Sequence, residues 1–152
     1  PEADMPQPVP LGWREWLALP ALGIVAIRAK VDSGARTSCL HVDEHEAFRR
    51  DGIEWVRFRI DTGVPGAPPG QAEARIVDRR AVTDSGGHVT ERVFILTPMR
   101  LAGMEFEAEV NLAQRRHLRF PMLLGRTALA GRFLVDPASS FLQGDTPPDA
   151  SP

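Results

Sequence analysis

The sequence contains little of what several common protein classes require. Its single cysteine, Cys39, excludes a disulfide within the chain and a four-cysteine zinc site. No run approaches the roughly 20 apolar residues of a membrane span, and residues 1–10 lack the apolar core of a signal peptide. A net charge of −2 gives no general attraction to nucleic acid or membranes. We therefore expect a cytoplasmic protein that binds neither.

The length and the proline distribution predict one folded domain. A chain of 152 residues with 43% hydrophobic and 25% charged residues is typical of one globular domain. Residues 1–10 and residues 143–152 are rich in proline, which disfavours packed helices and strands. The expected organisation is a flexible N-terminal arm over 1–10, a domain over 11–142 and a flexible tail over 143–152.

Short apolar runs separated by turn residues predict an all-β fold, a small barrel or sandwich. Asp43–Arg50 is predicted to be a short helix, because Asp43 is a suitable N-cap and Gly52 follows its end, and Thr127–Ala130 is a second helix candidate. The expected strands are Trp13–Leu19, Ile24–Val31, Thr37–Val42, Trp55–Ile60, Ala72–Thr83, His88–Thr97, Met104–Leu112, Met122–Gly125 and Phe133–Asp136. Cys39 is expected to be a small core residue of the third strand.

The segment Ala29–Ser38 combines residue types that suit acid–base chemistry. An apolar strand leads into Asp32, which can act as the acid or base. The hydroxyl of Ser33 can donate to a carboxylate, Gly34 permits close backbone approach, and Ala35 leaves room beside it. Taken alone, an Asp-Ser-Gly triplet is most often a plain turn.

A second segment changes this interpretation. Met122–Arg126 reads as apolar residues followed by Gly125 and Arg126. In this order, and in an all-β chain of this length, the two segments resemble the retropepsins, the single-domain aspartic peptidases of retroviruses. Leu17–Ile24, Ala29–His41, Phe120–Leu129 and Arg132–Pro137 look like one bacterial branch, often labelled "ATP-dependent zinc protease". The resemblance covers about residues 11–142.

The resemblance implies a retropepsin-like closed barrel with one or two short helices and a catalytic Asp32. Such enzymes place two carboxylates a few Å apart, where like charges cannot both ionise, so the pair shares one proton. One member activates a water and the other polarises the scissile carbonyl. Each chain offers one such Asp, so the resemblance implies a homodimer that hydrolyses peptide bonds.

The resemblance also assigns supporting roles. Ser33 would donate to the outer carboxylate oxygen, Gly34 would contact substrate backbone, and Ala35 and Thr37 would support the site. Leu124, Gly125 and Arg126 form the second motif, in which Arg126 would pair with a carboxylate near the dimer seam. The turn made by Asp84, Ser85, Gly86 and Gly87 matches the place of a retropepsin flap, although a plain exposed hairpin fits it equally well. The chain has no tyrosine, so any flap tyrosine is absent.

Bacterial members are commonly encoded beside ATP-grasp glutamate ligases that modify a ribosomal protein. This association suggests a glutamate ligase, or a glutamate-extended ribosomal protein tail, as substrate or partner. No cofactor is expected, and no phosphate-binding loop of the Gly-x-x-x-x-Gly-Lys type is present.

Two alternatives stay open at this point. His41, Glu44 and His45 fit the H-x-x-E-H pattern of a zinc peptidase, which needs both imidazoles on one helix face. A binding module that keeps the fold without catalysis is the third class. Asp61–Gly63 is an Asp-Thr-Gly triplet similar to Asp32–Gly34, but Val64 and Pro65 follow it, so we interpret it as a hairpin loop.

Overall fold

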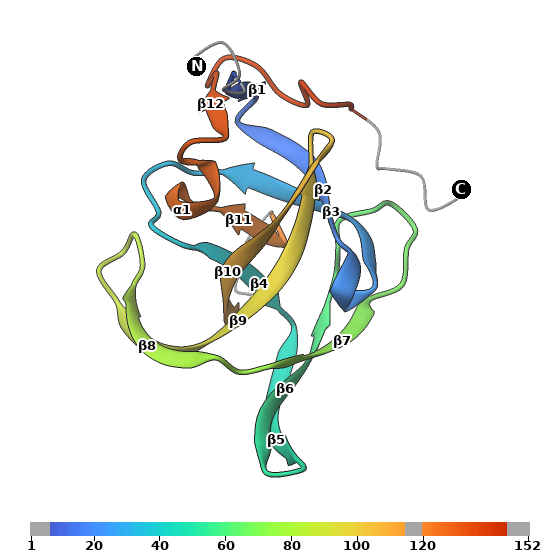
Figure 1. Cartoon of the computed structure of the whole chain (residues 1–152), viewed down its shortest axis with the longest axis vertical. Coiled ribbons are helices and arrows are strands. Elements are labelled where there is room, and N and C mark those ends of the chain that lie inside the picture. Colours follow the sequence, from blue (N-terminus) through green and yellow to red (C-terminus); the bar gives the residue numbers. More distant parts are fainter. Residues whose placement is uncertain (1–6, 115–119, 146–152) are drawn as a thin grey trace, which may run out of the picture.

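The computed structural model describes residues 7–114 and 120–145, and strands dominate it (Figure 1). Its helical segments are the 3₁₀ turn η2 at Pro20–Leu22 and the one-turn helix α1 at Arg126–Leu129. The strands are β1 Val9–Leu11, β2 Arg14–Leu19, β3 Ile24–Val31, β4 Ser38–Val42, β5 Glu44–Arg50, β6 Ile53–Ile60, β7 Gly70–Arg75, β8 Asp78–Thr83, β9 Val89–Leu101, β10 Met104–Gln114, β11 Met122–Leu124 and β12 Phe133–Val135. The predicted all-β class is confirmed.

The main sheet has the strand order β10-β4-β11-β3-β2-β9-β8, and β9 also pairs with β10. The sheet register between β2 and β9 consists of one residue pair, Ala18 with Arg100. The closed barrel therefore stays a prediction. A second sheet has the order β5-β6-β7, and β1 pairs in parallel with β12.

One hydrophobic core joins the main sheet to the second sheet. In β6 the residues at alternate positions, Val56, Phe58 and Ile60, are buried, as expected for a strand with one face on a core. They belong to the same cluster as Ile27 of β3 and Leu124 of β11. The strands that carry the two sequence motifs are thus fixed in this core by their buried residues.

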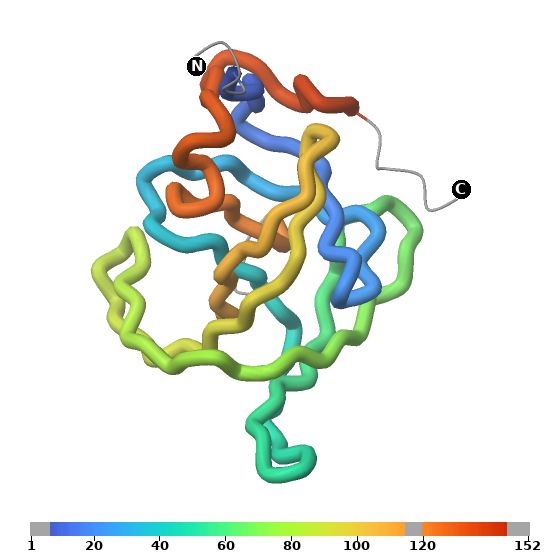
Figure 2. The backbone as a smooth tube through the Cα atoms, viewed as in Figure 1, coloured from blue at the N-terminus to red at the C-terminus, as the bar shows by residue number. Residues whose placement is uncertain are grey.

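The predicted helix at Asp43–Arg50 is wrong. Residues Glu44–Arg50 form β5, which pairs antiparallel with β6 along its whole length. Asp51 and Gly52 both have positive φ, 52° and 77°, as the two central residues of a tight hairpin turn require. Asp-Gly marks this hairpin, so Gly52 is a turn residue and not a helix end. The β5–β6 hairpin extends from the body of the molecule (Figure 2).

The chain ends of the folded part also differ from the prediction. Val9 and Pro10, predicted to lie in a flexible arm, belong to β1 and pair with Phe133 and Leu134. Gln143, assigned to the tail, donates its backbone N–H to the carboxylate of Glu15 at 3.1 Å. The remaining residues of the predicted arm and tail, 1–6 and 146–152, lie outside the described residues.

The predicted strand Ala72–Thr83 is two strands, because the chain leaves the second sheet after Arg75 and enters the main sheet at Asp78.

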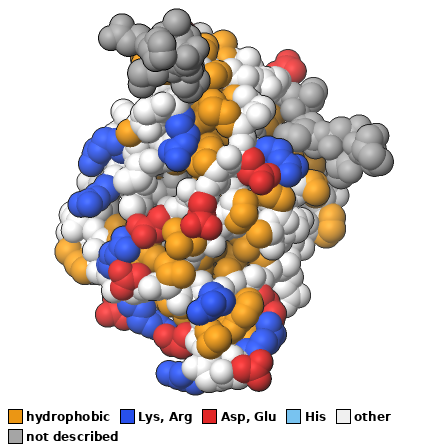
Figure 3. All heavy atoms as spheres, viewed as in Figure 1, with side chains coloured by type: hydrophobic (Ala, Val, Ile, Leu, Met, Phe, Trp, Pro, Cys, Tyr) orange, Lys and Arg blue, Asp and Glu red, His pale blue; other side chains and the backbone are white. Residues whose placement is uncertain are grey.

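Basic and acidic side chains are intermingled on the face shown in Figure 3. Within residues 7–114 and 120–145, no helix has the length and apolar character needed to cross a membrane.

Candidate active site

Asp32 lies directly after β3, where the strand leaves the core. Its backbone N–H donates to the carbonyl of Leu124 at 2.9 Å, which extends the parallel pairing of β3 with β11. The N–H of Gly34 donates to Oδ1 of Asp32 at 2.9 Å and so orients the carboxylate. Asp32 is half-buried, whereas Ser33 and Gly34 are exposed. The carboxylate is therefore fixed from inside while its loop, residues 32–37, faces solvent.

The second motif packs closely against the backbone at the end of this loop. Gly125 is buried, and a Cβ at this position would lie 2.4 Å from the carbonyl carbon of Thr37 and 2.9 Å from the N of Ser38. The N–H of Gly125 donates to the buried hydroxyl of Ser38 at 3.0 Å. Only glycine fits such an approach, so the two motifs are packed together at this point.

Helix α1 begins where the second motif ends, and its first N–H groups bind the Asp32 loop. The N–H of Arg126 donates to the carbonyl of Ala35 at 2.7 Å, and that of Thr127 donates to the carbonyl of Arg36 at 3.0 Å. The guanidinium of Arg126 donates to the carbonyl of Ser33 at 3.1 Å. Within one chain Arg126 thus binds a main-chain carbonyl, and its pairing with a carboxylate across a dimer stays a prediction.

The predicted flap candidate is the tip of the β8–β9 hairpin. Asp84 accepts the N–H groups of Gly86 and His88 on Oδ1, both at 2.9 Å, and its own N–H donates to the carbonyl of His88. Donation from the His88 and Gly86 backbone lowers the pKa of Asp84 from its ordinary value of 3.8. All residues from 83 to 91 are exposed. In Figure 1 this tip lies at the same edge of the molecule as the Asp32 loop.

A buried amide on β10 also contacts the Asp32 loop. Asn111 is 1% exposed, and its side-chain N–H groups donate to Oγ1 of Thr37 and to the carbonyl of Ser38, both at 3.1 Å. Its Oδ1 accepts from Arg92 of β9 at 3.0 Å. Sequence reasoning predicted Thr37 as a supporting residue but missed Asn111. The available signal was a polar residue among apolar neighbours in a strand, because a buried amide needs partners.

The Asp-Thr-Gly triplet at Asp61–Gly63 forms a turn similar to that of Asp32–Gly34 in a different place. The N–H of Gly63 donates to Oδ1 of Asp61 at 3.0 Å. The triplet lies in the loop that joins the antiparallel strands β6 and β7, which confirms the interpretation as a hairpin loop. Residues 61–63 follow β6 of the second sheet, whereas Asp32 is held by the second motif through Leu124.

The similarity of this chain to known proteins covers nearly the whole domain, with both motifs. Residues 10–146 match the family described as "RimB-like: Retropepsin-like aspartic endopeptidase RimB". The chain belongs to the RimB-like family. The resemblance to bacterial retropepsin-like proteins is thereby confirmed, and with it an aspartic-protease-like fold.

Curated relatives of this RimB-like chain are longer proteins. It is 39% identical over 142 residues to a "Probable alpha-L-glutamate ligase" of Shewanella halifaxensis, covering 88% of this chain and 30% of the relative. A protein of the same name from Desulfotalea psychrophila is 37% identical over 136 residues, covering 89% and 29%. The chain therefore spans about 30% of the length of these relatives.

A solved structure has the same fold as this RimB-like domain. It is a protein of unknown function from Legionella pneumophila, 26% identical, with a TM-score of 0.74. The similarity covers 90% of this chain and 98% of the other. The two chains therefore have almost the same extent as folded units.

The zinc alternative required a helix that the RimB-like domain does not form. His41 lies on β4, with Nδ1 3.0 Å from the carbonyl oxygen of Phe120. His45 lies on β5 and is exposed. The two imidazoles therefore lie on different strands, in different sheets, and do not share the helix face that the pattern needs. Among the described residues, no three His, Cys, Asp or Glu side chains are grouped to hold a metal.

Proposed function

We propose that the chain is one subunit of a homodimeric aspartic endopeptidase. In this proposal Asp32 and the Asp32 of a second copy share one proton, because two carboxylates a few Å apart cannot both be charged. The ionised carboxylate removes a proton from a water molecule, which attacks the scissile carbonyl carbon. The protonated carboxyl polarises the carbonyl oxygen and then donates its proton to the leaving amide nitrogen as the C–N bond breaks.

The proposal depends on one observation. Asp32 is the residue at which the first motif reaches solvent, and the second motif fixes it through Leu124 at 2.9 Å. Its Oδ1 is oriented by Gly34, which leaves Oδ2 for other contacts. A single chain supplies one carboxylate in this geometry. A two-fold arrangement of two chains would supply the second.

An acidic peptide is the substrate class that fits best. The exposed Arg36 and Arg126 lie on either side of the contact between the Asp32 loop and α1. Arginine binds carboxylates through a planar pair of donors. Relatives named as glutamate ligases contain a region similar to this chain. We therefore propose a glutamate-extended protein tail, or a glutamate ligase itself, as substrate.

The test compares two aspartates in matching turns. Asp32 and Asp61 both accept the N–H of a glycine two residues later, at 2.9 and 3.0 Å. The assay follows, by mass spectrometry, cleavage of a peptide that ends in a run of α-linked glutamates, and of a purified glutamate ligase. Asp32→Asn should lower the rate by a factor on the order of 10³, whereas Asp61→Asn should retain it. Both substitutions keep the Oδ1 acceptor.

Each competing function predicts a different result. An Asp32→Asn protein that cleaves like the wild type would reject the proposal. Loss of activity with a chelator and with His45→Ala would point to a metallopeptidase. A wild-type protein that binds these peptides or the ligase without cleaving them would be a binding module. Light scattering of the wild-type protein should give the mass of two chains, and a strict monomer that cleaves would refute the shared site.

A further inference from the structure

Asn111 connects two parts of the molecule that lie far apart in the sequence. Its amide nitrogen donates to Thr37 and Ser38 of the Asp32 segment, and its carbonyl oxygen accepts from Arg92 of β9. Asn111 is 1% exposed, and these three contacts use both of its donors and its acceptor. A buried amide that is fully hydrogen-bonded fixes the relative positions of its partners.

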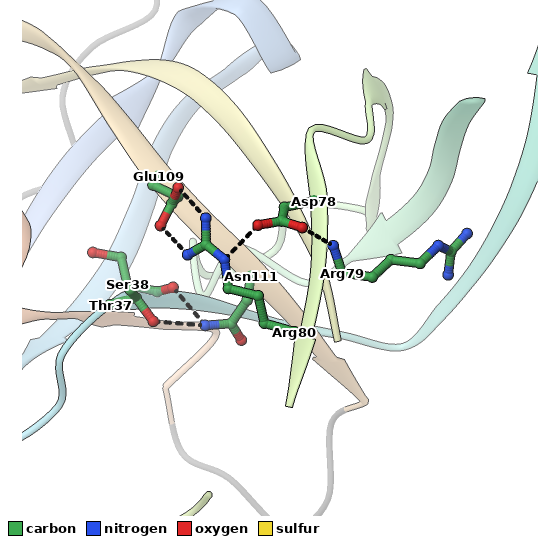
Figure 4. Close-up of polar contacts among 7 residues, drawn as sticks. All are labelled: Thr37, Ser38, Asp78, Arg79, Arg80, Glu109 and Asn111. Carbon is green, nitrogen blue, oxygen red and sulfur yellow. Dashed lines mark hydrogen bonds and ion pairs between the residues drawn. The ribbon is translucent and has the colours of Figure 1, made fainter. Parts of the chain in front are cut away.

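The β8–β9 hairpin meets β10 at two neighbouring points. Arg80 of β8 lies directly across from Arg92 of β9. Arg80 binds both carboxylate oxygens of Glu109, at 2.6 and 2.9 Å, and Arg92 binds Asn111, two residues further along β10. Figure 4 shows Arg80 paired with Glu109, and the amide of Asn111 bonded to Thr37 and Ser38. The Arg92 contact continues through Asn111 to the Asp32 loop.

The segment Thr37–Ser38, which Asn111 binds, also contacts the second motif. The hydroxyl of Ser38 accepts the N–H of Gly125, and the residue before Gly125, Leu124, accepts the N–H of Asp32. A shift of Thr37 and Ser38 would therefore move the groups that place the Asp32 carboxylate.

We infer that Asn111 and Arg92 are positioning residues that couple the β8–β9 hairpin to the Asp32 loop. This inference rests on the proposed peptidase function. Arg92 belongs to the strand that returns from the hairpin tip, so an inward movement of the hairpin over a substrate is transmitted through Asn111 to Thr37. Placement of a reacting group within a fraction of an Å governs the chemical step more than ground-state binding.

The central variant is Asn111→Asp, which keeps the shape of the side chain. Its carboxylate still accepts from Arg92, but it loses both N–H donors to Thr37 and Ser38. We expect kcat to fall by about 10- to 100-fold with KM changed by less than about 3-fold. Arg92→Gln should lower kcat in the same way. Arg100→Gln is the matched control, because Arg100 joins the same two strands through an exposed ion pair with Glu105.

A double-mutant cycle tests whether the effect passes through the Thr37 hydroxyl. Thr37→Val removes the acceptor without changing the size of the side chain, and Thr37→Ser retains the acceptor and should restore kcat. If the contact acts as a unit, Thr37→Val combined with Asn111→Asp should be no slower than the slower single variant. Fully additive losses would contradict the coupling.

The outcomes separate this inference from the proposed function. One outcome overturns this inference and leaves the proposed function standing. In that outcome the wild-type protein cleaves, Asp32→Asn is inactive, and Asn111→Asp has an unchanged kcat. Cleavage by Asp32→Asn at the wild-type rate overturns the proposed function and this inference with it. If Asn111→Asp does not fold, the comparison of Thr37→Val with Thr37→Ser decides: equal kcat for the two overturns the inference.

Discussion

Gly125 lies so close to Thr37 that an added Cβ would be 2.4 Å from the Thr37 carbonyl carbon and 2.5 Å from its oxygen. Both contacts are with backbone, which cannot rotate away. The Gly in the second motif is therefore required by the packing of the two motifs, independently of any contact with substrate.

This packing predicts the effect of Gly125→Ala. The substitution should lower the free energy of unfolding by about 3 kcal/mol through overpacking and displace the Asp32 loop. Gly131→Ala is the control, because a Cβ there meets no atom within 4 Å, although its φ of 79° is unfavourable for alanine. We expect the control to cost about 1 kcal/mol. Urea denaturation of both variants measures the difference, and equal losses would contradict the steric explanation.

The strands that contain the two motifs could be predicted well from the sequence. Ile24–Val31 was predicted with the observed bounds of β3, because an apolar run ends at Asp32-Ser33-Gly34. Glu44–Arg50 was not, because a polar segment after an N-cap residue is typical of a surface helix. Its extended conformation comes from pairing with β6. The hydrophobic periodicity of one segment does not reveal such a contact with another segment.

The sequence pattern also did not reveal which polar residues lie inside the domain. Glu15 and Asn111 lie in strands and look like solvent-facing positions of an alternating pattern. Each is buried because its partners, the 141–143 segment and Thr37, come from distant parts of the chain. Cys39, by contrast, was predicted to be a core residue and is buried, since an apolar neighbourhood is visible locally.

The buried thiol leads to a prediction about reactivity. Burial raises the pKa of Cys39 to about 11, although the nearby Arg92 opposes this. The thiolate is the reactive form, so the native protein should not react with iodoacetamide at about pH 8. After unfolding, the thiol should react at the rate of an ordinary cysteine. Mass spectrometry of native and unfolded samples measures this. Rapid alkylation of the native protein would show that the strand opens.

The turn at the hairpin tip should depend on pH. The pKa of Asp84 is lowered by N–H donation from His88 and Gly86. Because the pKa is lowered, the Asp84 carboxylate stabilises the turn fully at pH values above its ordinary pKa of 3.8. This stabilisation is lost as the pH falls through the lowered pKa. Amide protection at Gly86 and His88 should be present at about pH 6 and reduced at about pH 2.

A substitution separates this effect from general acid unfolding. Asp84→Asn keeps the Oδ1 acceptor but does not titrate. Protection of the Gly86 amide in this variant should be independent of pH over the range in which the rest of the domain stays folded. A variant with the same pH dependence as the wild type would show that another group controls the turn.

Glu15 is a buried carboxylate whose ligands are all backbone N–H groups. It is fully buried and accepts from Gly12 at 2.6 Å, from Leu142 at 2.9 Å and from Gln143 at 3.1 Å. Phe141, the residue before them, stacks on Trp16 with ring centroids 6.2 Å apart. The Glu15 side chain therefore holds the segment after β12 against the start of the domain.

Replacement of Glu15 should release that segment. Glu15→Gln exchanges one acceptor oxygen for an NH₂ group, which would face a backbone donor. We expect a loss of about 2–3 kcal/mol in unfolding free energy, because hydrogen bonds to a buried charge are the strong ones, and faster proteolysis near Phe141. Glu105→Gln, which breaks only an exposed ion pair with Arg100, should cost less than about 1 kcal/mol. If both variants were equally stable, the buried carboxylate would contribute no more than a surface charge, and the segment would owe its position to Phe141.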